Sequence, residues 1–266
     1  MSFNDPSSAG SAPSGSASPD GAAVSLPEAV HSSSPEILAS AASDPALGED
    51  LALVLLKRSD LPGQVLSRLS KNSGLVKSRK VKLAVIEHPR TPRHVSVPMV
   101  RHLFTFDLMQ VVLTPVVAAD IKMAAEEALI HRLERLPQGE RLSLAHRASG
   151  RVAAELLLDP EPRVVRAALE NPRLTESALI SALMRHDAPT ALVVAVCNDP
   201  RWSPRREIRL ALLGNPATPL DLALEIAGSL PSDLVREILR DSRLPEAVKE
   251  RLLNDLKERG QRHETE

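Results

Sequence analysis

A short turn built on an X-Pro dipeptide recurs along most of this chain, and each copy separates two apolar runs with helical spacing. The clearest copy is Gly214-Asn215-Pro216-Ala217-Thr218-Pro219. Pro216 has no N–H to donate and disfavours helical geometry in the residue before it, so a helix must end near Asn215. Thr218 is expected to cap the next helix, and Pro219 to occupy its first position, where a missing N–H costs nothing. The motif therefore predicts a helix end and a helix start within about one turn.

The same layout is found at three other places in the chain. Asn and Gly readily adopt the left-handed geometry of a helix C-terminus, and His88 stands where Asn is found in the other copies, so it is expected to cap a helix C-terminus. The residues assigned to these turns and caps are His88, Pro89, Thr91 and Pro92, then Asn171, Pro172 and Thr175, then Ser203 and Pro204.

One Asn-Pro pair is a common turn, but this many copies indicate a repeat. The segment 81–90 aligns without gaps with the segment 164–173, and Val, Ala, Glu, Pro and Arg coincide. The offset corresponds to three units of about 28 residues, a size typical of helical-hairpin repeats. Because one such unit cannot bury its apolar face alone, we expect neighbouring units to stack around one continuous core.

Composition limits what such an array can bind. The chain has 266 residues, of which 43% are hydrophobic but only 2% aromatic, with no Tyr. The core must therefore be aliphatic, and there is little aromatic surface on which a nucleobase or a flat cofactor could stack. No serine-nucleophile arrangement, Gly-rich phosphate loop or metalloprotease helix is present. We therefore expect a non-catalytic protein without a cofactor or a metal.

Charge and composition divide the chain into three segments. Residues 1–46 are rich in Ser, Ala, Pro and Gly and carry acidic residues but no Lys or Arg, which predicts a disordered acidic tail. A short helix near 35–39 is possible within it. Residues 47–258 form the predicted solenoid, and the charged residues 259–266 are expected to fray.

The Asn-Pro-x-Thr-Pro turns between short helices resemble those of the leucine-rich repeat variant family and, more loosely, HEAT-type repeats. The resemblance covers roughly residues 48–258. It implies a right-handed superhelix of short stacked helices, with α and 3₁₀ elements alternating in the variant family. One type of member carries an iron–sulfur cluster on N-terminal cysteines, but the single cysteine of this chain is Cys197. The fold predicted for this chain is an all-α solenoid.

Arrays of this kind typically bind partners over an extended surface, so the leading hypothesis is a scaffold for protein–protein interaction. The alternative is binding of nucleic acid or another polyanion through the basic stretch 57–101, which the acidic tail could screen. A solvated helical face would explain the same charges without any ligand. The candidate anion- or partner-binding residues are Lys77, Arg79, Lys80, Lys82, Arg90, Arg93 and Arg101.

Two further residues stand out by type. Trp202, the only tryptophan, lies in a turn, where it either covers the end of a helical hairpin or contacts a partner. Cys197 ends an apolar run and is expected to be a buried, inert thiol. No run of about 18 apolar residues exists, and no signal peptide is recognised, so we expect a cytoplasmic protein that is not associated with a membrane.

Overall fold

The computed structural model describes residues 25–264, and every regular element in that range is helical. The predicted all-α solenoid is confirmed. Seventeen α-helices, most of them two to three turns long, follow one another with one 3₁₀ helix, η1(Leu133–Arg135), among them. The alternation of α and 3₁₀ elements that the family resemblance implied is wrong for this chain, because both helices of a unit are α-helical.

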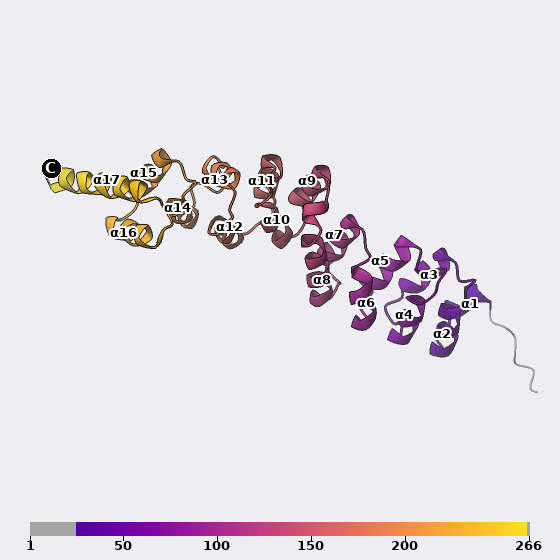
Figure 1. The fold of residues 1–266 in the computed structure, drawn as a ribbon. Helices are drawn as coiled ribbons and strands as arrows, with labels where there is room; N and C mark the ends of the chain where they lie inside the picture. Colours follow the sequence, from indigo (N-terminus) through magenta and orange to yellow (C-terminus); the bar gives the residue numbers. More distant parts are fainter. Residues whose placement is uncertain (1–24, 265–266) are drawn as a thin grey trace, which may run out of the picture.

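The helices form two rows in an elongated array, with α1 and α17 at opposite ends (Figure 1). The odd-numbered row consists of α1(Leu26–Ala29), α3(Glu49–Leu56), α5(Arg79–Glu87), α7(Thr105–Leu113), α9(Gln138–Arg147), α11(Pro162–Leu169), α13(Thr190–Cys197), α15(Leu220–Gly228) and α17(Glu246–Glu264). The even-numbered row consists of α2(Pro35–Ser43), α4(Gly63–Leu69), α6(Arg93–Val100), α8(Ala119–Ile130), α10(Gly150–Leu156), α12(Glu176–Leu183), α14(Arg206–Leu213) and α16(Ser232–Asp241). Helices pack chiefly against the helix two places along the chain, as α3 does against α5 and α10 against α12.

Buried aliphatic side chains fill the space between the rows in two clusters, not in the one continuous core that was expected. The first cluster runs from Val30 to Val95 and the second from Ile86 to Leu256. The division falls on α5, where Val85 belongs to the first cluster and Ile86 to the second. Met99 of α6 packs against both clusters and joins them.

The turns share one local hydrogen bond. In seven turns between residues 25 and 264, an Asp, Asn or His side chain accepts a hydrogen bond from the backbone N–H two residues later, which closes the turn without left-handed backbone geometry. C-cap His88, for example, has φ −70° and ψ 127°, the extended geometry that a following proline favours. His88 is thus confirmed as a helix C-cap, but the left-handed geometry expected of the turns is not used there. The seven residues are Asp44, Asn72, His88, Asp159, Asn171, Asp199 and Asn215.

Four of these side chains also connect consecutive repeats. Each donates a hydrogen bond to a backbone carbonyl near the end of a helix that lies 26 to 32 residues earlier. The separations agree with the repeat length predicted from the sequence. The bonds join Asn72 to Ala42, His88 to Arg58, Asn171 to Ala145 and Asn215 to Leu183, with donor–acceptor distances of 2.7 to 3.1 Å.

The predicted threonine caps divide into two kinds. Thr175 caps α12 as expected, since its hydroxyl accepts a hydrogen bond from the Ala178 N–H. The N-cap prediction for Thr91 and Thr218 is wrong: prolines 92 and 219 are the N-cap residues. Each of these two threonine hydroxyls instead donates to a carbonyl six residues earlier, in the last turn of the preceding helix, where backbone carbonyls lack partners.

The turn predicted to end in a cap at Ser203 is longer than expected. Helix α14 begins at Arg206 with Arg205 as its N-cap, so neither Ser203 nor Pro204 starts it. The Asp199 side chain accepts hydrogen bonds from the N–H groups of both Arg201 and Trp202, and this extends the turn by two residues.

The ordered array begins earlier than the predicted boundary at residue 46. Helices α1 and α2 lie within the segment expected to be disordered, and Leu38, Ala39 and Ala42 of α2 are buried against α4. The short helix considered near 35–39 is confirmed as part of α2. Composition did not reveal its packing, because the small apolar alanines of α2 gain burial only when α4 covers them. Residues 1–24 of the predicted tail lie outside the described residues.

The C-terminal helix also continues beyond the predicted boundary at residue 259. Helix α17 runs to Glu264, and its charged residues are good helix formers. The Arg259 guanidinium pairs with Asp255 at 2.7 Å and donates to the Leu224 carbonyl of α15. Residues 265 and 266 lie outside the described range. No helix between residues 25 and 264 has both the length and the apolar character needed to cross a bilayer.

Candidate functional site

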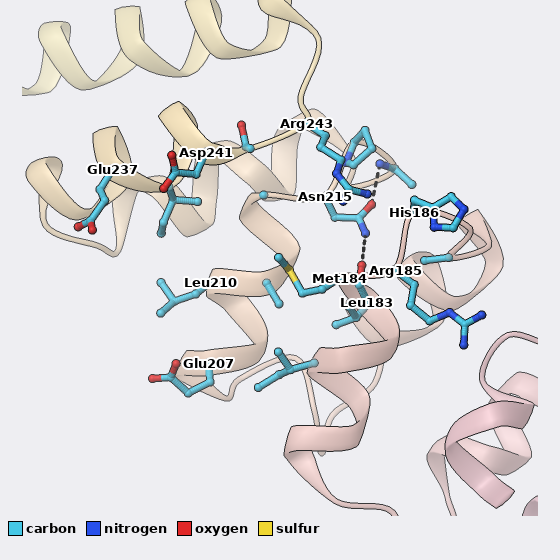
Figure 2. A pocket seen from close by; sticks show the side chains of 18 of the residues that line it. Leu183, Met184, Arg185, His186, Glu207, Leu210, Asn215, Glu237, Asp241 and Arg243 are labelled. Atoms are coloured by element: carbon cyan, nitrogen blue, oxygen red, sulfur yellow. Dashed lines mark hydrogen bonds between the residues drawn. The ribbon is translucent and has the colours of Figure 1, made fainter. Parts of the chain in front are cut away.

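A groove crosses the even-numbered row where α12, α14 and α16 lie side by side (Figure 2). We call it the α12–α16 groove. Its volume is about 860 Å³, and it is open to solvent along its length. The turns that follow α12 and α14 close one end of it.

The floor of the groove is aliphatic. Met184, which follows α12, leaves 60% of its surface exposed, and it points into the space between the helices (Figure 2). Leu210 of α14 and two residues of α16, Leu234 and Ile238, are only partly buried. Apolar side chains of three successive repeats thus remain uncovered side by side.

Asn215 forms the closed end of the groove and holds two repeats together. Its amide donates to the Leu183 carbonyl at 2.9 Å, and its side-chain oxygen accepts from the Ala217 N–H at 2.9 Å. Both interactions are drawn in Figure 2. Because these bonds engage both ends of the Asn215 amide, its role here is to fix the wall of the groove.

Acidic side chains line one side of the groove. Glu207 comes from α14, and Glu237 and Asp241 come from consecutive turns of α16 (Figure 2). Glu207 pairs with its neighbour Arg206 at 3.1 Å. Among the described residues, no cationic group lies within ion-pair distance of Glu237 or Asp241. These two carboxylates therefore repel each other across one helical turn.

Basic side chains lie on the other side and at the closed end. Arg185 and His186 follow α12, and Arg243 follows α16. Arg185 donates two hydrogen bonds to Asp187, both 2.9 Å long, and lies 3.5 Å from Glu155. The hydrogen bonds from Arg185 lower the pKa of Asp187 to about 2. The positive charge of Arg185 is thus already paired with carboxylates, whereas no carboxylate of the described part of the chain pairs with Arg243.

Arg185 also borders a second, smaller hollow of about 480 Å³ between α10 and α12. Ala154 of α10 and Leu158, which follows α10, line it, with Ala178 of α12 on the opposite side. Because Arg185 lies between the two hollows, the open surface of the even-numbered row extends over four successive helices.

The seven basic residues singled out in the sequence come from both rows of helices. Most of them serve contacts between repeats. The Arg79 guanidinium donates to both carboxylate oxygens of Asp107, at 2.6 to 2.9 Å, and Asp107 is only 2% exposed. Lys80 lies 3.5 Å from Glu49, and Arg93 pairs with Asp120. Arg90 donates to the Asp60 carbonyl.

The other three, Lys77, Lys82 and Arg101, have no ion pair within the described part of the chain. Lys77 precedes α5 and Lys82 lies on it, in the odd-numbered row, whereas Arg101 follows α6 of the even-numbered row. The basic residues are therefore spread over both rows.

The candidate partner contact Trp202 is not accessible. Its side chain is 1% exposed, and its indole N–H donates to the Leu169 carbonyl at 3.0 Å. The guanidinium groups of Arg201 and Arg205 cover the ring at 4.4 and 4.7 Å from its centre. Trp202 thus covers the end of a helical hairpin, the alternative considered for it. Its assignment as a partner contact is wrong, because the extended turn at Asp199 directs the ring inward.

Cys197 is half-buried at the end of α13, and burial raises the pKa of its thiol. Within the described residues, no cluster of His, Cys, Asp and Glu side chains has the arrangement of a metal site. Among the described residues, one carboxylate oxygen each of Asp120 and Asp255 is buried without an aligned hydrogen bond, although the Asp255 oxygen is ion-paired with Arg259, and neither residue lines the groove.

The α12–α16 groove was not anticipated from the sequence. Met184 and His186 end one helical run, and Glu237 and Asp241 belong to an ordinary amphipathic helix. Comparison of the chain with protein-family models, with curated proteins and with solved structures finds no match. The helical-repeat architecture stands without assignment to a family.

Proposed function

We propose that this protein is a non-catalytic helical-repeat scaffold that binds another protein through the α12–α16 groove. The observation that carries the proposal is the uncovered aliphatic floor between α12, α14 and α16. Exposed apolar surface costs free energy in water, and such surface rimmed by charged residues is typical of protein–protein contact sites.

The test compares two methionines with almost equal exposure. Met184 lies in the groove with 60% of its surface exposed, and Met123 lies on α8 with 59% exposed. Affinity capture with the full chain, with Met184→Glu and with Met123→Glu, followed by quantitative mass spectrometry, should yield proteins that Met184→Glu loses and Met123→Glu retains. Equal capture by both variants would place the contact elsewhere, and no specific capture by the full chain would refute a scaffold function.

Polyanion binding through 57–101 is the weaker candidate. Arg79, Lys80 and Arg93 are paired with carboxylates, and the cations without an ion pair, such as Lys77, Lys82 and Arg101, are divided between the two rows. A salt-dependent titration with heparin tests it: Lys77→Glu combined with Lys82→Glu should leave the affinity unchanged. A large loss of affinity would instead favour the polyanion function.

The same proposal assigns the protein to the cytoplasm. A single cysteine cannot form an internal disulfide, and proteins without structural disulfides are typical of the reducing cytosol. Fractionation of the source cells, with blotting for the full chain, tests this assignment.

A further inference from the structure

We propose that the α12–α16 groove takes a short segment of a partner protein in which a large aliphatic side chain is flanked by Lys or Arg. This inference rests on the binding function proposed above, and it specifies the chemistry of the partner. Three properties of the groove lead to it, namely its size, its floor and its uncompensated charge.

The size of the groove favours a short segment over a folded domain. Pockets of about 300–1,000 Å³ enclose a drug-sized molecule or a few side chains, and the groove falls within that range at about 860 Å³. The hollow is bounded by three helices, so a bulky convex surface would meet the helices and leave the floor empty. A segment that inserts one or two side chains fills it.

The floor requires an aliphatic anchor. Met184, Leu210 and Ile238 present methyl and thioether groups without an aromatic ring among them. Met adapts its shape to different partners because its chain is unbranched and its sulfur is polarizable. A Leu, Ile or Met side chain of the partner would bury itself against these three residues.

The charge of the groove requires a cation beside that anchor. Glu237 and Asp241 have no cationic partner, whereas the positive charge of Arg185 is matched by Asp187 and Glu155. Of the two arginines that line the groove, only Arg243 is left to offset the acidic side. A Lys or Arg of the partner placed between Glu237 and Asp241 would remove their mutual repulsion.

A small polar ligand lacks what it would need here. Such sites fix their ligand through a few well-placed polar groups. In this groove the Asn215 amide is engaged by Leu183 and Ala217, the Ser242 hydroxyl donates to the Leu239 carbonyl, and most of the remaining polar side chains are charged.

The chain's own N-terminal segment is a poor match as well. Residues 1–24 contain Asp5 and Asp20 and no Lys or Arg, so their charge has the wrong sign. They connect to α1, at the end of the array opposite to the groove (Figure 1). The occupant is therefore a segment of another protein.

The experiment is a selection of displayed random 12-residue peptides on the full-length protein. Enriched peptides should contain Leu, Ile or Met within a few positions of Lys or Arg. Synthetic versions should bind Met184→Glu at least about tenfold more weakly, which corresponds to the loss of one well-packed anchor contact, and should bind Met123→Glu as they bind the unchanged chain. Charge reversal in Glu237→Lys with Asp241→Lys should select peptides with Asp or Glu in place of the cation.

Three results would overturn the inference. One is enrichment of peptides without Lys or Arg, and another is binding that survives Met184→Glu. The third is a dimer in light scattering that Met184→Glu dissociates, since the groove would then take a second copy of this chain. If the captured proteins still depend on Met184 while the selected peptides lack the cation, the scaffold function stands and only the partner chemistry fails.

Discussion

Asn215 and Leu183 lie 32 residues apart in the chain, yet the Asn215 amide donates a 2.9 Å hydrogen bond to the Leu183 carbonyl. The bond ties the turn after α14 to the end of α12. Met184 follows Leu183 directly, so the same bond fixes the wall of the α12–α16 groove. An Asn beside a helix end thereby connects two repeats. Similar bonds are made by Asn72, His88 and Asn171, and substitutions can measure how much each bond contributes to the free energy of unfolding.

Asn171 provides the clearest measurement. Its amide donates to the Ala145 and Ala148 carbonyls at 2.7 and 3.2 Å, and all of it is buried. Asn171→Ala leaves both carbonyls without a partner, so we expect the free energy of unfolding to fall by about 2–3 kcal/mol. Urea denaturation followed by circular dichroism measures it.

Asn198 is the matched control for that substitution. It is exposed, and its amide bonds only to the Val194 carbonyl of its own helix. Asn198→Ala should therefore change the urea midpoint little. If both variants unfold at the same urea concentration, the bonds between repeats contribute no stability.

The role of Thr218 is tested by two polar substitutions. Its hydroxyl donates to the Leu212 carbonyl at 2.7 Å, and a carboxylate cannot donate. Thr218→Ser should retain stability, whereas Thr218→Asp should lose about 1 kcal/mol. A side chain that caps α15 would instead leave Thr218→Asp about as stable as Thr218→Ser, because Asp and Ser are equally good N-caps. Thermal unfolding of the two variants distinguishes these roles.

Trp202 supplies a spectroscopic readout of the fold, since the chain has one Trp and no Tyr. Its burial predicts a blue-shifted emission that acrylamide quenches weakly and that shifts to the red on unfolding. Trp202→Phe keeps most of the ring but leaves the Leu169 carbonyl without its donor, and it should cost about 1–3 kcal/mol by thermal unfolding. A partner bound at the groove should leave the emission unchanged. Strong quenching in the folded protein would contradict the buried position.

Acid should weaken the Arg185–Asp187 pair. The pKa of Asp187 is lowered from 3.8 to about 2, chiefly by the hydrogen bonds from Arg185. A carboxyl whose folded pKa is lowered stabilises the protein fully above its unfolded pKa, and loses that contribution as the pH falls through its folded pKa. The contribution of this pair should thus disappear between about pH 4 and pH 2.

The Arg185→Gln variant isolates this effect. Without the guanidinium, the pKa of Asp187 should return towards 3.8, as followed by NMR of the side-chain carboxyl. The stability of the variant should also depend less on pH in that window. An unchanged titration of Asp187 would show that another group sets its pKa.

The architecture followed from residues whose chemistry allows few alternatives. Pro89, Pro172 and Pro216 must interrupt a helix, so their recurrence predicted the turns and the repeat length. Side chains that can make several kinds of interaction were harder to assign. A threonine hydroxyl both donates and accepts, so Thr218 could not be assigned from its position alone. The orientation of Trp202 depended on a turn two residues longer than its relatives.

The candidate site was the least predictable feature. The basic stretch was visible in the sequence, but pairing such as that of Arg79 with Asp107, 28 residues later, depends on which helices become neighbours. The α12–α16 groove lies between three repeats that share one sequence pattern. Local sequence describes each repeat well and describes the space between three repeats poorly.

The bonds between repeats have a direction. Every side-chain hydrogen bond to a backbone carbonyl 20 or more residues away, within the described part of the chain, runs from a later donor to an earlier acceptor, as from His88 to Arg58 and from Asn171 to Ala145. A ribosome produces the earlier residue first. Each unit that leaves the exit tunnel therefore supplies donors to carbonyl acceptors of a unit that the ribosome has already released.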